Sequence, residues 1–179
     1  MLTHTEGNIK LKISNLQERH KLSPALLTSF SEACAVVLDQ LTKDTPIQFK
    51  MVMNENESIL KLDWEKPNSL TKKSYANTKD ATEYGAYALA FASLDALEDY
   101  QVVHRAFQGS GSDFLLMKRG ETNDENVIRL EVSGIFDNGN LNLRVREKVE
   151  QLEKGKLKKP GIAHVTAFNQ ELIQARRVP

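Results

Sequence analysis

The sequence predicts an α/β protein in two parts. Short runs in which apolar and polar residues alternate, as in half-buried strands, are interspersed with longer runs in which apolar residues recur every three or four positions, as in amphipathic helices. A polar stretch without either period, at residues 67–79, separates residues 1–66 from residues 80–179. We therefore expect a small N-terminal appendage, a linker and a larger C-terminal core.

The appendage is predicted to be β-α-β-β. Residues 8–14 alternate isoleucine and leucine with lysine, which indicates a strand. Ser23 and Pro24 are an N-cap and a first helical residue, and the apolar stripe after them predicts a helix that ends near residue 41. Residues 47–53 and 58–64 alternate again around an asparagine-rich turn, which is typical of a hairpin.

The core is predicted to follow the order helix, strand, strand, strand, helix, strand. Asp80 and Glu83 have the spacing of a capping box at the start of the first helix. The expected elements are a helix at 80–99, strands at 100–107, 113–117 and 127–136, a helix from residue 141, and a strand at 162–168 before a short polar end.

Composition excludes several classes of protein. The 179 residues include 24 Lys and Arg, 24 Asp and Glu, and a single cysteine, so neither a disulfide framework nor a cysteine metal cluster is expected. No apolar run approaches the roughly 18 residues of a membrane span. The first residues lack a basic region followed by an apolar stretch, so we expect no signal peptide, no membrane association and a cytoplasmic location.

The zero net charge conceals an uneven distribution. Residues 80–137 contain four basic and eleven acidic side chains, whereas residues 141–179 contain nine basic and four acidic ones. One face can therefore contact phosphates while another holds a cation, although such charge runs are usually solvated surface.

Two acidic residues lie on adjacent predicted strands. Asp113 opens the second strand of the core, and Glu131 lies on the polar side of the third. Neighbouring strands are about 4.8 Å apart, so the two carboxylates can share a hard cation such as Mg²⁺. Hydrolysis of a phosphodiester needs this arrangement together with a nearby positive charge, which Arg144 or Lys148 could supply.

Residues 80–168 resemble the PD-(D/E)XK, or restriction-endonuclease-like, nuclease superfamily, in particular its small resolvase-like members. The resemblance rests on the order of elements and on four segments: ATEYGA at 81–86, YQVV at 100–103, GSDFLL at 111–116 and LEVS at 130–133. It implies a restriction-endonuclease-like αβββαβ core, Asp113 and Glu131 as ligands of Mg²⁺ or Mn²⁺, and Glu83 as an auxiliary acid.

The resemblance fails at one position. The lysine two residues after the family's glutamate is here Ser133, which carries no charge. Either Lys148 on the next helix replaces it, or catalysis has been lost.

Each candidate also has a structural explanation. Asp113 can finish a turn, Glu131 can form an ion pair with Arg144, and Glu83 can cap its helix. Arg144, Lys148 and Gln151 lie on a polar helix face, where they either contact nucleic acid or remain solvated. The four histidines are scattered without the spacing of a zinc site, and they are His4, His20, His104 and His164.

These observations lead to three hypotheses. The first is a Mg²⁺- or Mn²⁺-dependent nuclease in which Asp113, Glu131, Glu83 and Lys148 act together. The second is an inactive protein of the same fold that binds nucleic acid or a partner protein, for example in phage defence or a mobile element; Ser133 and the neutral net charge favour it. The third is a homodimer formed along an exposed sheet edge.

Overall fold

The computed structural model describes residues 8–42 and 44–179, and within them the strands form one eight-stranded mixed sheet with the order β1-β3-β2-β8-β7-β6-β5-β4. Five α-helices accompany the sheet. The α/β class is therefore confirmed. The elements are β1 (Asn8–Lys12), α1 (Leu16–Arg19), α2 (Pro24–Leu41), β2 (Ile47–Met53), β3 (Asn56–Asp63), α3 (Ser69–Ser74), α4 (Thr78–Glu98), β4 (Tyr100–Arg105), β5 (Phe114–Lys118), β6 (Ile128–Ile135), α5 (Leu141–Lys154), β7 (Gly161–Ala167) and β8 (Leu172–Val178).

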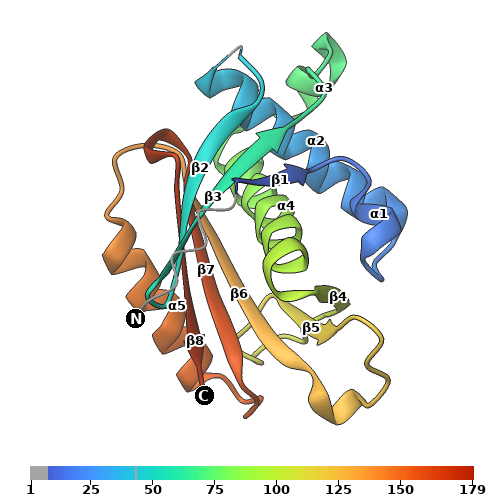
Figure 1. The fold of residues 1–179 in the computed structure, drawn as a ribbon, viewed down its shortest axis with the longest axis vertical. Coiled ribbons are helices and arrows are strands. Elements are labelled where there is room, and N and C mark those ends of the chain that lie inside the picture. The colour runs from blue at the N-terminus through green and yellow to red at the C-terminus, as the bar shows by residue number, and fades with distance from the viewer. Residues whose placement is uncertain (1–7, 43) are drawn as a thin grey trace.

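The helices lie on opposite faces of the sheet. Figure 1 shows α4 across one face of β6 and β7, with α2 packed against it, and α5 on the other face. Every residue of β7 is buried, because a strand that is covered on both faces has no solvent side. Cys34 of α2 is fully buried in the core between the helices.

The start of α2 follows the sequence prediction. Ser23 accepts a hydrogen bond from the backbone N–H of Leu26 at 3.3 Å, and Pro24 occupies the first helical position, where no N–H is needed. The hairpin is also confirmed: β2 and β3 are antiparallel, and the turn between them places Asn54 in the left-handed region at φ 55°.

The start of α4 differs from the prediction. Asn77 is the N-cap, and its side chain accepts from the backbone N–H groups of Lys79 and Asp80 at 3.1 and 3.4 Å. The capping box of Asp80 and Glu83 was therefore wrong, because the asparagine three residues earlier already satisfies the first free donors. Glu83 is left without a capping role and is exposed on the helix.

The prediction lacked the single-turn helix α1 and two further elements. Residues 67–79, expected as an unpatterned linker, contain the short helix α3, which Asn68 caps through the N–H groups of Leu70 and Thr71. The expected polar end of the chain contains β8, which lies in the middle of the sheet between β7 and β2. Since β2 pairs with β8 in parallel, strands from residues 1–66 and from residues 80–179 belong to the same sheet.

The second half of the chain has the predicted order of elements. β4, β5 and β6 form an antiparallel meander, and α5 then crosses over the sheet so that β7 runs parallel to β6. Asp113 precedes β5, and Glu131 lies in the middle of β6, so the meander places them on neighbouring strands.

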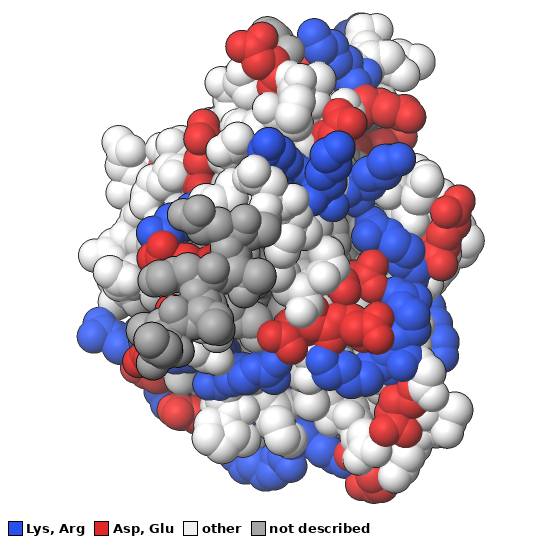
Figure 2. All heavy atoms as spheres, viewed as in Figure 1, with Lys and Arg blue, Asp and Glu red and all other residues white. Residues whose placement is uncertain are grey.

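The surface carries both signs of charge. On the face shown in Figure 2, basic and acidic side chains are interspersed. Within the described ranges, no helix is both long enough and apolar enough to cross a membrane.

Candidate functional site

Glu131 is buried in the centre of the sheet. Its exposed fraction is 1%, and its Oε1 accepts a hydrogen bond from Lys148 Nζ of α5 at 2.6 Å. The other oxygen, Oε2, is also buried and receives no hydrogen bond from any residue the structure describes. A buried carboxylate oxygen without a donor is costly, so Oε2 requires either a proton or a cation.

Asp113 lies beside Glu131 because a tight loop brings it there. Its Oδ2 accepts from the backbone N–H of Val132 at 2.9 Å, and its own N–H donates to the carbonyl of Leu130 at 2.9 Å. The loop before it depends on Gly111, whose φ is 80° and whose Cβ would lie 2.5 Å from the Cα of Gly155. The glycine-rich segment at residues 109–112 is thus packed closely against the end of α5.

Burial and neighbouring negative charge raise the pKa of both carboxyl groups. Burial, followed by the charge of Asp113, raises the pKa of Glu131 to about 7, against the lowering effect of Lys148. Burial likewise raises the pKa of Asp113, against the lowering effects of the Val132 N–H and Lys148. One lysine therefore does not neutralise both carboxylates. When no cation is bound, the two carboxyl groups can share a proton.

Lys148 takes a central place in this group. It is half-buried, and besides Glu131 its Nζ donates to Gln151 Oε1 at 3.2 Å. The sequence prediction that Lys148 lies near the carboxylates is thus matched by the geometry, and Gln151 acts first as an acceptor for the lysine.

Arg144 and Ser133 line a cleft beside Asp113 but are not part of the carboxylate pair. Arg144 is exposed and pairs with Glu147 at 3.3 Å, so the predicted alternative of an ion pair between Arg144 and Glu131 was wrong; Lys148 forms that pair. Ser133 is half-buried beside Gly134 and lines the cleft, where it brings no charge.

Glu83 approaches the site from α4. Its Oε1 accepts a hydrogen bond from the Tyr87 hydroxyl at 2.8 Å, and its charge raises the pKa of Asp113. The sequence did not single out Tyr87 as a site residue. The available signal was its position four residues after Glu83, which places both side chains on one helix face.

A cleft of about 610 Å³ opens beside Asp113. Glu131, which is buried, is not among the residues that line it. The cleft lies between α4, β6 and the start of α5. Its walls include Glu83, Tyr87, Asp113, Ser133, Arg144 and Lys148. Five of the residues proposed from the sequence therefore line one cavity.

The oxygen donors fit a hard cation only in part. Nowhere in residues 8–42 and 44–179 do three His, Cys, Asp or Glu side chains gather closely enough to hold a metal ion by themselves. Mg²⁺, however, usually keeps several waters and binds one or two carboxylates together with the substrate's phosphate. Asp113 and the unpartnered oxygen of Glu131 meet that smaller requirement.

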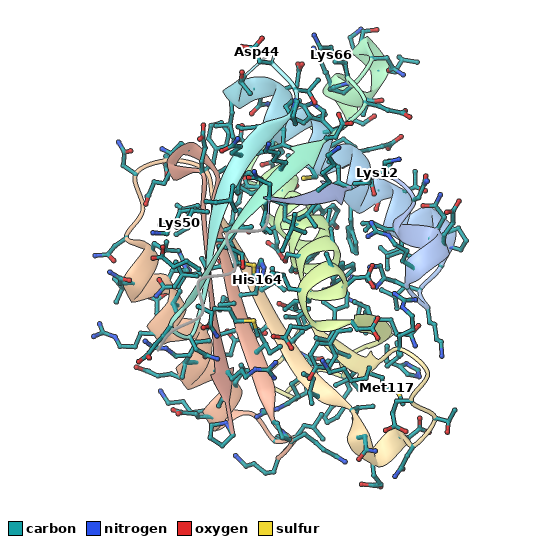
Figure 3. The ribbon with its side chains drawn as sticks, viewed as in Figure 1. Lys12, Asp44, Lys50, Lys66, Met117 and His164 are labelled. Carbon is teal, nitrogen blue, oxygen red and sulfur yellow. The ribbon has the colours of Figure 1, made fainter. Side chains whose placement is uncertain are left out.

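The three histidines that the structure describes do not contribute to this group. His164 is at the centre of the molecule (Figure 3), where its Nε2 lies 3.1 Å from the Ser93 hydroxyl and burial lowers its pKa to about 3. His20 is buried near the other end of α4, His104 is exposed on β4, and His4 lies outside the described residues.

Comparison with protein-family models, with curated proteins and with solved structures finds no match to this chain. The function must therefore be inferred from the geometry of the site.

Proposed function

We propose that this protein is a divalent-metal-dependent nuclease with a restriction-endonuclease-like core. The observation that carries the proposal is Glu131. It is fully buried in a central strand, one of its oxygens is paired with Lys148, and the other has no donor within the described part of the chain. A merely structural ion pair would leave no reason for that second oxygen to be placed beside another carboxylate.

The order of elements supports the same proposal. α4, β4, β5, β6, α5 and β7 follow the αβββαβ order of the superfamily, with the aspartate directly before its second strand and the glutamate in its third. The two positions are predicted from sequence by resemblance, and in the fold they are neighbours through the Val132 N–H.

Asp113 and Glu131 are the residues that would hold Mg²⁺ or Mn²⁺. When bound, such an ion polarises a phosphoryl oxygen and lowers the pKa of a water molecule. The protein's contribution is to fix the two carboxylates: the Val132 N–H orients Asp113, and the Lys148 ammonium orients Glu131 from the opposite side.

Lys148 fills the role left open by Ser133. Its ammonium reaches the glutamate from α5 instead of from the same strand, and Gln151 limits its rotation by accepting a second hydrogen bond. From this position Lys148 can stabilise negative charge that develops on a phosphate in the cleft. Glu83, held by Tyr87, is placed to accept a proton from a water at the cleft wall.

A second candidate function is that of a noncatalytic subunit that binds nucleic acid or protein. The observation that favours it is Ser133, since the superfamily's strand lysine is absent and Lys148 is already engaged by Glu131. In that case the carboxylate pair would be a remnant that neither binds a cation nor supports hydrolysis.

The test is Mn²⁺ binding followed by hydrolysis. Calorimetric titration of Mn²⁺ is performed on the wild type and on the Asp113→Asn/Glu131→Gln double variant, and each is then incubated with single-stranded and duplex DNA and RNA. We expect binding and hydrolysis in the wild type, and a loss of hydrolysis of about 1,000-fold or more in the double variant, as for removal of essential charged groups.

A matched control is Glu57→Gln. Glu57 also accepts from a lysine, Lys50, at 2.7 Å, but both side chains are exposed on the surface of the β2–β3 hairpin. This variant should keep both activities. Failure of the wild type to bind Mn²⁺, even with nucleic acid present, or hydrolysis that survives in the folded double variant, would reject the nuclease and favour the noncatalytic subunit.

A further inference from the structure

The candidate site is open on two sides. A second hollow of about 740 Å³ adjoins the cleft already described, and the two share Asp113 and Glu147 in their walls. The second hollow is lined by the loop between β4 and β5 and by the C-terminal half of α5. A ligand that reacts at Asp113 can therefore extend in both directions, as a polymer does.

The second hollow has an exposed aromatic ring in its wall. Phe107 has an exposed fraction of 57%, and its ring packs against no other aromatic ring of the described residues. The ring is therefore available to a ligand that presents a flat face to it. Nucleobases are such ligands, because every base has a flat face that stacks on an aromatic ring.

The loop that carries Phe107 is held in place at both ends. The Ala106 N–H donates to the Asp113 carbonyl at 3.0 Å, and the Lys156 N–H donates to the Gly109 carbonyl at 3.0 Å. The close approach of Gly111 to Gly155 fixes the loop against α5. The loop therefore holds Phe107 in a fixed position relative to Asp113, as a binding platform requires.

At one point in this hollow, a positive charge is available to bind a phosphate backbone. Its acids Glu147 and Glu150 are engaged by Arg144 and Lys154, at 3.3 and 3.1 Å. Arg105, in contrast, forms no ion pair within the described ranges, and its guanidinium lies over the Phe114 ring at 5.4 Å. Arg105 is exposed two residues before Phe107, and both residues line the same hollow.

We propose that the substrate is a single-stranded nucleic acid, with an unpaired base stacked on Phe107 and a neighbouring phosphate bound by Arg105. This inference rests on the proposed function, since it specifies the substrate of the same site. A duplex keeps its bases stacked on one another and offers no free face to Phe107, whereas an unpaired strand does.

The test measures binding without hydrolysis. Fluorescence anisotropy of a labelled oligo-dT and of a labelled DNA duplex is recorded in EDTA for the wild type, Phe107→Ala and Phe107→Trp. We expect the wild type to bind the single strand more tightly than the duplex, and Phe107→Ala to weaken the single-strand affinity about 10-fold or more while leaving the duplex affinity unchanged. Phe107→Trp should retain the wild-type affinity.

Two further variants act as controls. Leu70→Ala removes another exposed apolar side chain, 71% exposed on α3 and outside both hollows, and should change neither affinity. Arg105→Gln should reduce the slope of log affinity against log salt for the single strand by about 0.7, the contribution of one phosphate contact.

The inference is overturned if oligo-dT does not bind, if Phe107→Ala leaves its affinity unchanged, or if the variant weakens single strand and duplex equally. These outcomes are separate from those of the hydrolysis test. Hydrolysis that depends on Glu131, with no effect of Phe107, rejects only the single-strand inference. Phe107-dependent binding without any hydrolysis rejects only the nuclease.

Discussion

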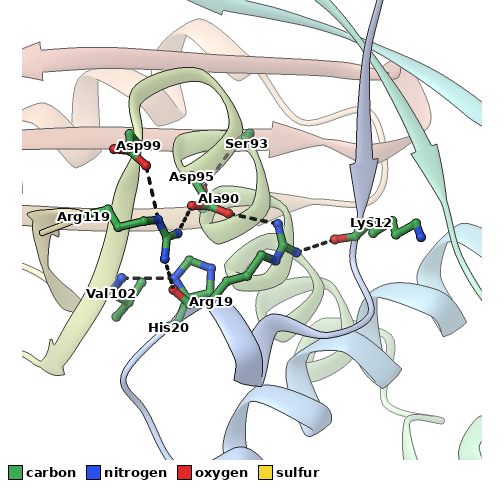
Figure 4. A network of polar contacts seen from close by, with 9 residues as sticks. All are labelled: Lys12, Arg19, His20, Ala90, Ser93, Asp95, Asp99, Val102 and Arg119. Atoms are coloured by element: carbon green, nitrogen blue, oxygen red, sulfur yellow. Dashed lines mark hydrogen bonds and ion pairs between the residues drawn. The ribbon is translucent and has the colours of Figure 1, made fainter.

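The two ends of α4 carry charged clusters that are balanced in different ways. Near its C-terminus, Asp95 accepts from both Arg19 and Arg119, and Arg119 also pairs with Asp99 (Figure 4). Two aspartates there meet two arginines. Near its N-terminus, Glu83 of α4 lies close to Asp113, which forms a carboxyl pair with Glu131. One lysine serves this pair, and one oxygen lacks a donor in the described part of the chain.

The contrast separates a structural cluster from the one that we propose to be functional. Paired charges with satisfied hydrogen bonds hold α1, α4 and the end of β5 together, so the Asp95 cluster serves the fold. The Asp113–Glu131 pair retains the electrostatic cost of buried negative charge that is not fully compensated, which is typical of sites that stabilise a ligand. The number of countercharges, more than the degree of burial, distinguishes the two.

The largest expected effect on stability follows from removing Asp95. Asp95→Ala leaves Arg19 and Arg119 without their shared acceptor, and because both arginines are partly exposed we expect the free energy of unfolding to fall by about 2 kcal/mol. Urea denaturation measures this. Glu131→Gln, which removes the excess negative charge at the other end of α4, should leave stability at pH 8 unchanged or higher. Equal losses in the two variants would contradict the comparison.

The two ends of α4 should also respond to pH with opposite signs. The folded-state pKa of Glu131 is raised from 4.5 to about 7, so the folded protein binds the extra proton and its contribution to stability falls as pH rises through that interval. Burial lowers the pKa of His20 from 6.5 to about 4, so its contribution is lost as pH falls from 6.5 towards 4.

The measurement is the unfolding free energy across this pH range in the wild type and two variants. The difference between Glu131→Gln and the wild type should increase by about 2 kcal/mol between mildly acidic and mildly basic pH. His20→Asn, whose amide oxygen can still accept from the Val102 N–H that now donates to His20 Nδ1 at 3.1 Å, should instead flatten the loss of stability at acidic pH. Parallel curves for all three proteins would refute the assignment.

The smallest expected effect is at Tyr87. Tyr87→Phe removes the hydroxyl that donates to Glu83 and should reduce hydrolysis about 3- to 10-fold, because Glu83 is then free to rotate. The ring stays packed against Phe30 and Phe114, so stability should change by less than about 1 kcal/mol. A steady-state assay with a denaturation control separates the two effects, and an unchanged rate would remove Glu83 from the site.

The sequence predicted most of what depends on local pattern. Alternation indicated β1 and the β2–β3 hairpin, and Ser23 with Pro24 located the start of α2. The proximity of Asp113, Glu131 and Lys148 was also predictable, because consecutive strands of a meander are neighbours and the following helix packs over them.

What sequence could not provide depends on distant partners. β8 was missed because Gln174, Arg176 and Arg177 make its residues look polar, whereas the strand is selected by the edges of β7 and β2 that it joins. The unpartnered oxygen of Glu131 depends on which donors reach it in three dimensions. Phe107 is distinguished by the exposure of its ring, which no local sequence pattern indicates.

The central position of β8 has a consequence for how the protein is made. β2 at residues 47–53 finds its second neighbour only at residues 172–175, more than a hundred residues later in synthesis. Until that segment leaves the ribosome, the β1–β3–β2 ribbon has an open edge of unpaired backbone groups. The other part of the sheet, β4 to β7, which carries Glu131, has an equally open edge at β7. The nascent chain is therefore most exposed to association with other chains just before its final strand closes the sheet.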